Sequence, residues 1–179
     1  MIRLKFTVVF MASIASWMLV ANQAVLGAAE ALSWEKWQPL LGTWKAEGKG
    51  NPGQGAGTFS FAFELQNKVI VRKSHTDYPA SEGRPAFAHD DLMIIYGDES
   101  SRHFRADYFD NEGHVIRYAA EFSADGKAVT LVSDAVPSQP AFRLVYTIMS
   151  AASLGIKFEI APPNAPDQFK VYVEGEARK

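Results

Sequence analysis

The stretch Leu40-Leu41-Gly42-Thr43-Trp44 divides the chain into two parts of different character. Before it, Ser33 can cap a short helix over residues 34–41, because its hydroxyl can accept a backbone N–H of the first turn. Pro39 lies late in that segment and limits the helix to one or two turns. Gly42 can then take the left-handed conformation that ends it. After this stretch the chain reads as strands and turns.

About ten strand-like runs follow, separated by short segments rich in Gly, Asp, Asn and Pro. Short strands at regular spacing with tight turns are typical of an antiparallel meander. Such a sheet must curl and close, because open edges invite aggregation. We therefore expect an all-β fold, a closed antiparallel meander barrel of about ten strands with a short N-terminal helix. The expected strands are 43–49, 57–65, 69–78, 87–96, 102–110, 114–123, 127–133, 141–149, 154–161 and 169–177.

Tight turns between the expected strands determine which residues lie opposite each other. Asn111-Glu112-Gly113 suits a three-residue hairpin loop with Gly in the left-handed region, and Asp125-Gly126 suits a two-residue type I′ turn. A third loop, Ala151-Ala152-Ser153, joins two later strands. The predicted pairs are Tyr108–Ile116, Ala106–Tyr118 and Phe104–Ala120 for the first turn, Phe122–Val129 and Ala120–Leu131 for the second, and Ile148–Ile156, Tyr146–Phe158 and Leu144–Ile160 for the third.

These registers collect apolar side chains on one face of the sheet and charged side chains on the other. The inward face is expected to continue at alternate residues from Phe59 to Leu65 and from Phe169 to Val173. The charged set resembles an acid–base cluster, but the register places it on the solvent face as surface pairs. It comprises His103, Arg105, Asp107, Arg117 and Glu121.

A barrel interior lined with aromatic side chains follows from this partition. Buried tyrosines combine an apolar ring with a hydroxyl that needs a partner. The third strand supplies a basic anchor, either Arg72 or His75, depending on the turn at Gln66-Asn67. A base there would suit a ligand with a carboxylate or another acceptor, whereas the alternative is a filled core. The expected ligand-binding residues are Phe61, Phe63, Tyr108, Tyr118, Tyr146 and Phe158, with Arg72 or His75.

The N-terminal residues have the pattern of a secretory signal. Arg3 and Lys5 precede an apolar run over residues 6–21, and small residues follow it. The run is short for a bilayer core of about 30 Å, although an uncleaved anchor is the alternative interpretation. We expect cleavage after Ala29, with Gly27 or Ala31 as alternative sites.

Composition narrows the class of protein. The 179-residue chain has no cysteine, which excludes disulfides, thiol catalysis and thiolate metal sites. Its net charge of −2, with the signs interspersed, provides no basic stripe for nucleic acid. We expect residues 1–29 to be the signal and residues 30–179 to form a single domain, secreted or periplasmic, with no membrane span after cleavage.

Few residues suggest catalysis or metal binding. His75-Thr76-Asp77 and His89-Asp90-Asp91 place possible ligands at alternate positions, which share one face of a strand. Neither has a known ligand spacing, and no third ligand is evident. No nucleophile elbow or phosphate-binding loop is present either. The sequence therefore predicts no catalytic residue, no metal and no cofactor.

The opening stretch resembles that of the calycin superfamily, which includes lipocalins and fatty-acid-binding proteins. Together with Glu47-Gly48-Lys49-Gly50 it is similar to the opening motif of nitrobindin-like ten-stranded barrels. The resemblance implies that Trp44, delivered by the turn at Gly42, closes one end of the barrel. Nitrobindins bind haem iron through a histidine near the C-terminal strand. No histidine follows His114 here, so that haem site is not expected.

The resemblance implies a lipocalin-like barrel that encloses a small hydrophobic or amphipathic molecule. The leading expectation is a non-enzymatic binding protein. Two alternatives stay open. One is an enzyme of the isomerase, cyclase or decarboxylase type, whose only supply of polar groups would be Arg72, His75, His89 and Asp91. The other is a filled-core structural or interaction domain. The sequence leaves ligand identity and oligomeric state open.

Overall fold

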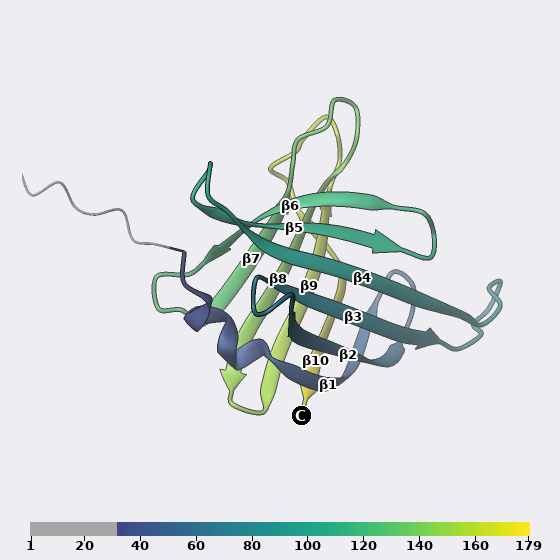
Figure 1. Ribbon diagram of the computed structural model, residues 1–179. Coiled ribbons are helices and arrows are strands. Elements are labelled where there is room, and N and C mark those ends of the chain that lie inside the picture. Colours follow the sequence, from purple (N-terminus) through teal and green to yellow (C-terminus); the bar gives the residue numbers. More distant parts are fainter. Residues whose placement is uncertain (1–31) are drawn as a thin grey trace, which may run out of the picture. The chain divides into compact units, whose positions relative to one another are not determined.

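The computed structural model describes residues 32–179, which form a closed antiparallel β-barrel of ten strands preceded by a short 3₁₀ helix (Figure 1). The expected all-β barrel is thereby confirmed, while the expected signal at residues 1–29 lies outside the described residues. The elements are η1 (Trp34–Leu40), β1 (Gly42–Gly50), β2 (Gly55–Glu64), β3 (Val69–Tyr78), β4 (Phe87–Asp98), β5 (His103–Asp110), β6 (Val115–Phe122), β7 (Ala128–Ser133), β8 (Ala141–Ser150), β9 (Ser153–Ala161) and β10 (Lys170–Arg178).

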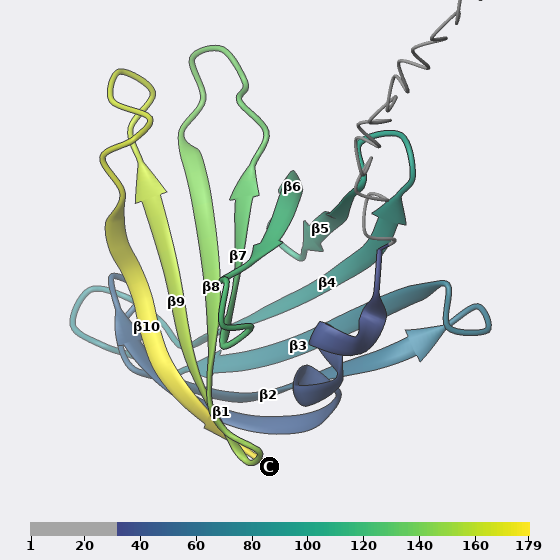
Figure 2. The same cartoon turned by 90° about the vertical axis from the view of Figure 1, so that its left-hand side faces the viewer.

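The strands follow a simple meander, and β1 pairs with β10 to close it. In Figure 2 the strands β1 to β4 run across the view while β7 to β10 run upward, so the two walls of the barrel cross each other. In a meander, successive connections alternate between the two ends. The end that carries η1 is called here the helix end. The opposite end, with the β1–β2, β3–β4, β5–β6, β7–β8 and β9–β10 connections, is called the open end.

The segment before β1 forms largely as predicted. The Ser33 hydroxyl accepts the Glu35 backbone N–H at 3.2 Å and so caps η1. The helix is of the tighter 3₁₀ kind and ends at Leu40, with Pro39 in its last turn. Gly42 has a φ of +106°, a conformation that favours glycine and turns the chain into β1.

Aromatic side chains fill the helix end. Trp37 and Leu40 of η1 and Trp44 of β1 are fully buried. The Trp44 indole Nε1–H donates to the Leu40 carbonyl at 2.8 Å, which ties the helix to the first strand. Trp37 packs edge-on against Phe122 with ring centroids 5.1 Å apart. Trp44 is thus buried among the side chains that pack at the helix end, and its role in closing the barrel stays a prediction.

Glycines allow close backbone approach between β1 and β10 and between β2 and β3. A Cβ on Gly50 would lie 2.0 Å from the Tyr172 carbonyl oxygen, and one on Gly57 would lie 2.0 Å from that of His75. No side chain fits at such distances. Interior strand glycines are typical of tight bends in barrels, where another backbone approaches closely. These two positions let neighbouring backbones come close enough to close the barrel.

The registers predicted from the first two turns are confirmed. The β5–β6 ladder pairs Tyr108 with Ile116, and the β6–β7 ladder pairs Phe122 with Val129. The third register is wrong by two residues, because Tyr146 lies opposite Ile156 rather than Phe158. The connection is tighter than expected, with Ser150 opposite Ser153, and a bulge follows it. A shift by two keeps every side chain on its expected face.

Two expected inward positions are wrong. Leu65 is 72% exposed, because β2 ends at Glu64 and Leu65 enters the turn with a φ of +50°. Val171 is 46% exposed and lies opposite the outward Glu159. A register shift between Val171 and Val173 interrupts the alternation there. Among residues 32–179, no helix has the length and apolar character needed to span a membrane.

Candidate binding site at the open end of the barrel

Several inward-facing side chains near the open end stay partly accessible, as do Phe63, Phe122 and Ile148 near the helix end. In a closed barrel, this means that solvent reaches the interior from the open end. A separate hollow of about 610 Å³ at this end lies beside the stacked rings of Tyr78 and Phe87, and its lining residues do not include the inward residues named next. The partly exposed inward residues include Thr76, His89, Tyr108, Ile116, Phe142 and Phe158.

A buried ion pair lies deeper in the interior. Arg72 of β3 and Asp91 of β4 are diagonal neighbours in the ladder, since Arg72 is opposite Met93 and Ser74 is opposite Asp91. Their side chains are 9% and 6% exposed, and Arg72 Nη1 donates to Asp91 Oδ1. Burial lowers the pKa of the Arg72 guanidinium, but attraction to Asp91 raises it, and the net pKa is above the ordinary value. Arg72 is therefore a cation.

Aromatic rings surround this cation. The Arg72 Cζ atom lies 5.2 Å from the Phe59 ring centroid and 5.9 Å from that of Tyr146. Ring faces attract cations at such distances. The Tyr146 ring also meets Phe61 edge-on at 5.4 Å. Burial raises the pKa of Tyr146 to about 12, so its hydroxyl is protonated and can donate a hydrogen bond.

Two polar atoms beside the ion pair make no well-aligned hydrogen bond within residues 32–179, although the Arg72 guanidinium lies close enough to the Tyr146 hydroxyl to oppose the rise of its pKa. The two atoms are Arg72 Nε and the Tyr146 hydroxyl oxygen. An unsatisfied buried polar group costs about 1–3 kcal/mol, and native proteins retain few of them. A bound molecule with a hydrogen-bond acceptor can satisfy both atoms. We call Arg72, Asp91 and Tyr146 the polar floor.

A hydrogen-bonded group of side chains lies between the polar floor and the rim, and among residues 32–179 its only contact with the floor is a 3.8 Å approach of His89 to Asp91. His89 Nε2 lies 3.0 Å from the Tyr108 hydroxyl and 3.8 Å from Asp91 Oδ2, while His89 Nδ1 lies 3.0 Å from Glu112 Oε1. Tyr108 also donates to Asp110 at 3.3 Å. Burial raises the pKa of Tyr108 well above its ordinary value, so the phenol stays protonated.

The chain of groups can hold and move a proton, but it is not arranged to bind a metal. Within residues 32–179, no three His, Asp or Glu side chains gather in a metal-binding arrangement. Neither His75 with Asp77 nor His89 with Asp91 finds the further ligand that such a site needs.

Most of the expected ligand-binding residues face the interior, at different depths. Tyr118 and Tyr146 are buried in its middle, and Tyr108 and Phe158 lie partly exposed toward the open end. Phe63 instead packs against Trp34 of η1, with ring centroids 5.6 Å apart, and belongs to the helix end. Phe61 is buried against Tyr146.

The structure decides between the two candidate anchors. Arg72 faces inward, whereas His75 is on the outer face, where its side chain is 50% exposed. There His75 Nδ1 lies 2.7 Å from Asp90 Oδ1, and that hydrogen bond raises the pKa of the imidazole. His75 as an interior anchor is therefore wrong, because residues 72 and 75 of one strand point to opposite faces.

Sequence reasoning did not assign Asp91, His89 and Phe59 to the binding set, although all three face inward. The register of β3 against β4 determines which residues of β4 face inward. It pairs Ser74 with Asp91 and Thr76 with His89. The connection between these strands, residues 79–86, is too long for a turn rule to set the register. The strict alternation of Phe59 with Phe61 was the signal available for Phe59.

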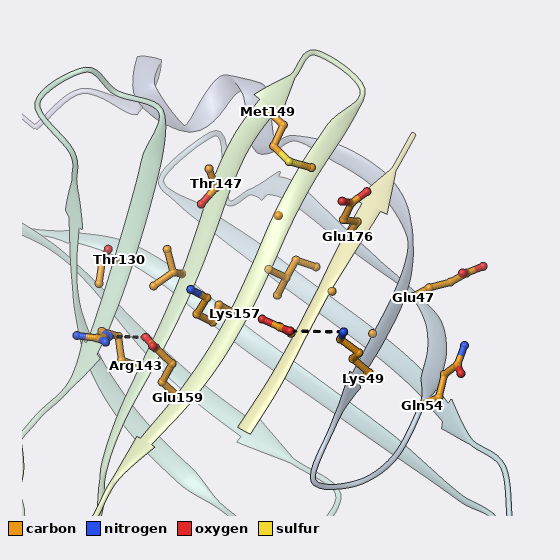
Figure 3. Close-up of a pocket in the computed structure, with 16 residues that line it drawn as sticks. Glu47, Lys49, Gln54, Thr130, Arg143, Thr147, Met149, Lys157, Glu159 and Glu176 are labelled. Carbon is orange, nitrogen blue, oxygen red and sulfur yellow. Dashed lines mark hydrogen bonds and ion pairs between the residues drawn. The ribbon is translucent and has the colours of Figure 1, made fainter. Parts of the chain in front are cut away.

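A larger hollow of about 890 Å³ lies on the outer face of β7 to β10 and β1 (Figure 3). Its charged groups satisfy one another. Arg143 Nε donates to Glu159 at 2.5 Å, and Lys49 lies 3.9 Å from Glu174. The Lys49–Glu174 pair is exposed and contributes about 0–1 kcal/mol, whereas Glu159 is buried and its charge is matched by Arg143. We therefore place the candidate site at the polar floor, which holds two of the three buried side-chain atoms that lack a hydrogen-bond partner within residues 32–179.

Comparison with known proteins supports the fold. No protein-family model matches the chain, and no curated protein matches its sequence. The crystal structure of Rv2717c from M. tuberculosis is similar, with a TM-score of 0.60 at 12% identity over 84% of this chain and 99% of that one. At this identity the likeness shows a shared barrel fold alone.

Two further likenesses are weaker. The S-type phycobiliprotein lyase CPES from Guillardia theta has a TM-score of 0.48 at 10% identity, covering 83% of this chain and 93% of its own. A de novo designed fluorescence-activating β-barrel has a TM-score of 0.40 at 15% identity, covering 79% and 94%. Neither carries an argument about the function of this chain.

Proposed function

We propose that this protein is a lipocalin-like, calycin-type barrel that binds a small amphipathic molecule inside its open half. The observation that carries the proposal is the polar floor, where Arg72 Nε and the Tyr146 hydroxyl are buried without hydrogen-bond partners among residues 32–179. Partly exposed apolar and aromatic side chains line the way to it, among them Ile116, Phe142 and Phe158. A few polar groups at the base of a mostly apolar site are typical of small-molecule binding.

The matched pair Ile116→Trp and Val115→Trp tests this proposal. Ile116 faces inward opposite Tyr108, and its neighbour Val115 faces outward and is 63% exposed. The probe is N-phenyl-1-naphthylamine, a neutral molecule whose fluorescence rises in apolar surroundings. We expect Ile116→Trp to weaken probe binding at least about fivefold, since it fills the path to the floor, and Val115→Trp to leave it unchanged. Equal binding by both variants would place the probe elsewhere and contradict the proposal.

We further propose that residues 1–29 direct export and are removed, so that the barrel is secreted or periplasmic. The support is the sequence pattern of a basic start, an apolar run and small residues. Intact-mass measurement of the protein recovered after expression of the full chain tests it. A mass that begins at residue 30, or at one of the alternative sites, is expected. An undiminished mass in the membrane fraction would indicate an uncleaved anchor.

A second candidate function is proton transfer to or from a bound molecule. The Glu112–His89–Tyr108 chain favours it, because the carboxylate can orient the imidazole while its other nitrogen contacts the phenol. This arrangement suits an isomerase more than a binding protein alone.

The probe for this candidate is 5-nitrobenzisoxazole, whose ring opens when a base removes one carbon-bound proton. We expect His89→Ala to remove most of the activity above buffer, and His75→Ala, on the outer face, to retain it. If His89→Ala and the unchanged protein react at the same rate, the relay is not catalytic.

A further inference from the structure

We infer that the polar floor selects uncharged ligands with a hydrogen-bond acceptor, such as a ketone, ester or amide, over carboxylates and over amines. The inference rests on the proposed function, since it names the chemistry of the same site. The sequence left open a carboxylate or another acceptor as the ligand group, and this inference selects the uncharged acceptor.

The charges of the polar floor balance each other. Asp91 already pairs with Arg72, and both side chains are less than a tenth exposed. No other carboxylate within residues 32–179 lies within salt-bridge distance of Arg72. The pair is therefore neutral as a unit. A ligand carboxylate would bring a second negative charge next to buried Asp91, and a buried charge without its own partner is costly.

Carboxylates nearer the open end also disfavour the binding of an anion. Asp110 has a side chain only 3% exposed and accepts from the His114 ring at 2.8 Å and from two backbone N–H groups, at 2.9 Å and 3.0 Å. The Glu112 Oε1 atom lies 3.0 Å from His89 Nδ1. These carboxylates lie along the path that a ligand takes past Tyr108.

The polar floor also disfavours a cationic head group on the ligand. An ammonium group carries only donors, and the unpartnered Arg72 Nε is itself a donor. Asp91 is engaged by Arg72, and a second cation there would be repelled by the guanidinium. A carbonyl oxygen has two lone pairs and no charge. It can accept from Arg72 Nε and from the Tyr146 hydroxyl together.

The experiment compares three ligands with similar tails, octan-2-one, octanoate and octylammonium, at pH 8. Affinity is measured by displacement of N-phenyl-1-naphthylamine from the wild-type barrel, so that no variant has to fold. We expect octan-2-one to bind at least about tenfold more tightly than either ion. Tyr146→Phe, which removes one donor and keeps the ring, should weaken octan-2-one binding several-fold and reduce octanoate binding less.

A charge-changing variant sharpens the test. Asp91→Asn leaves the Arg72 cation without its counter-charge, and we expect it to reverse the order in favour of octanoate. Tighter binding of octanoate or octylammonium to the wild type would overturn the inference and leave the proposed function standing. Failure of all three ligands and of the probe to bind would overturn both.

Discussion

At the residue scale, the Arg72–Asp91 pair is the unusual feature of the molecule. Charged groups this deep in an apolar interior need a partner of opposite charge, and Arg72 and Asp91 supply one to each other. Sequence alternation left Arg72 and His75 as alternative candidates for the inward position, because the turn at Gln66-Asn67 was undetermined. In the structure three consecutive residues there, Leu65 to Asn67, have positive φ, which is uncommon for residues other than glycine. The pattern of hydrophobic residues does not predict a turn of this kind.

Removing one partner of the pair should destabilise the barrel strongly. Arg72→Met leaves Asp91 as an uncompensated buried charge, and we expect a loss of about 3–5 kcal/mol in the free energy of unfolding. The double variant Arg72→Met with Asp91→Leu removes both charges, and we expect it to be as stable as the wild type or more stable. Urea unfolding measures both. Equal destabilisation by the single and double variants would show that the pair contributes through packing instead.

At the element scale, the strands were largely predictable and the ends of strands were not. Alternating side chains and short turns determine the faces, so the predicted pairs of β5, β6 and β7 are confirmed. The errors lie at irregular points, namely the bulge near the β8–β9 connection and the register shift between Val171 and Val173. A bulge inserts one residue without a marked sequence signal, and its effect spreads along the strand.

The junction between η1 and β1 supplies the prediction at this scale. Trp44→Ala removes a fully buried ring whose Nε1–H donates to the Leu40 carbonyl, and it opens a cavity at the helix end. We expect a loss of about 3–5 kcal/mol in the free energy of unfolding by urea. Val115→Ala, at a 63% exposed position, is the control and should change stability by less than about 0.5 kcal/mol. A loss below about 1 kcal/mol for Trp44→Ala would mean that this ring does not close the barrel.

At the scale of the whole molecule, aromatic side chains pack the helix end of the interior, and partly exposed side chains that include polar groups line its open end. The apolar interior followed from the sequence, and so did three inward tyrosines. The position of the polar floor did not, since it depends on how β3 and β4 pair across residues 79–86. The barrel therefore combines two of the sequence alternatives, because one half has a filled core and the other is where we propose that a ligand binds.

The buried tyrosines make the folded state sensitive to high pH. Burial raises the pKa of Tyr146 to about 12, against about 10 for an exposed tyrosine. The contribution of protonated Tyr146 to the free energy of unfolding is complete below pH about 10. It is lost as the pH rises toward 12, by about 1.4 kcal/mol per pH unit. Burial also raises the pKa of Tyr118 and Tyr108, which steepens the loss.

Absorbance of tyrosinate recorded alongside circular dichroism tests this. We expect the interior tyrosines to ionise only together with unfolding, and Tyr146→Phe to shift the alkaline unfolding midpoint upward. Ionisation of all tyrosines near pH 10 with the fold intact would show that the interior is solvated throughout.

The most direct test of the binding site is a nuclear magnetic resonance titration of the labelled barrel with octan-2-one. The account predicts that the Arg72 Nε–H resonance and the aromatic resonances of Tyr146 shift with saturation, while the methyl group of Met149, in the outer hollow, does not. Saturable shifts at Met149 with the Arg72 and Tyr146 resonances unchanged would place the ligand on the outer face and contradict the account.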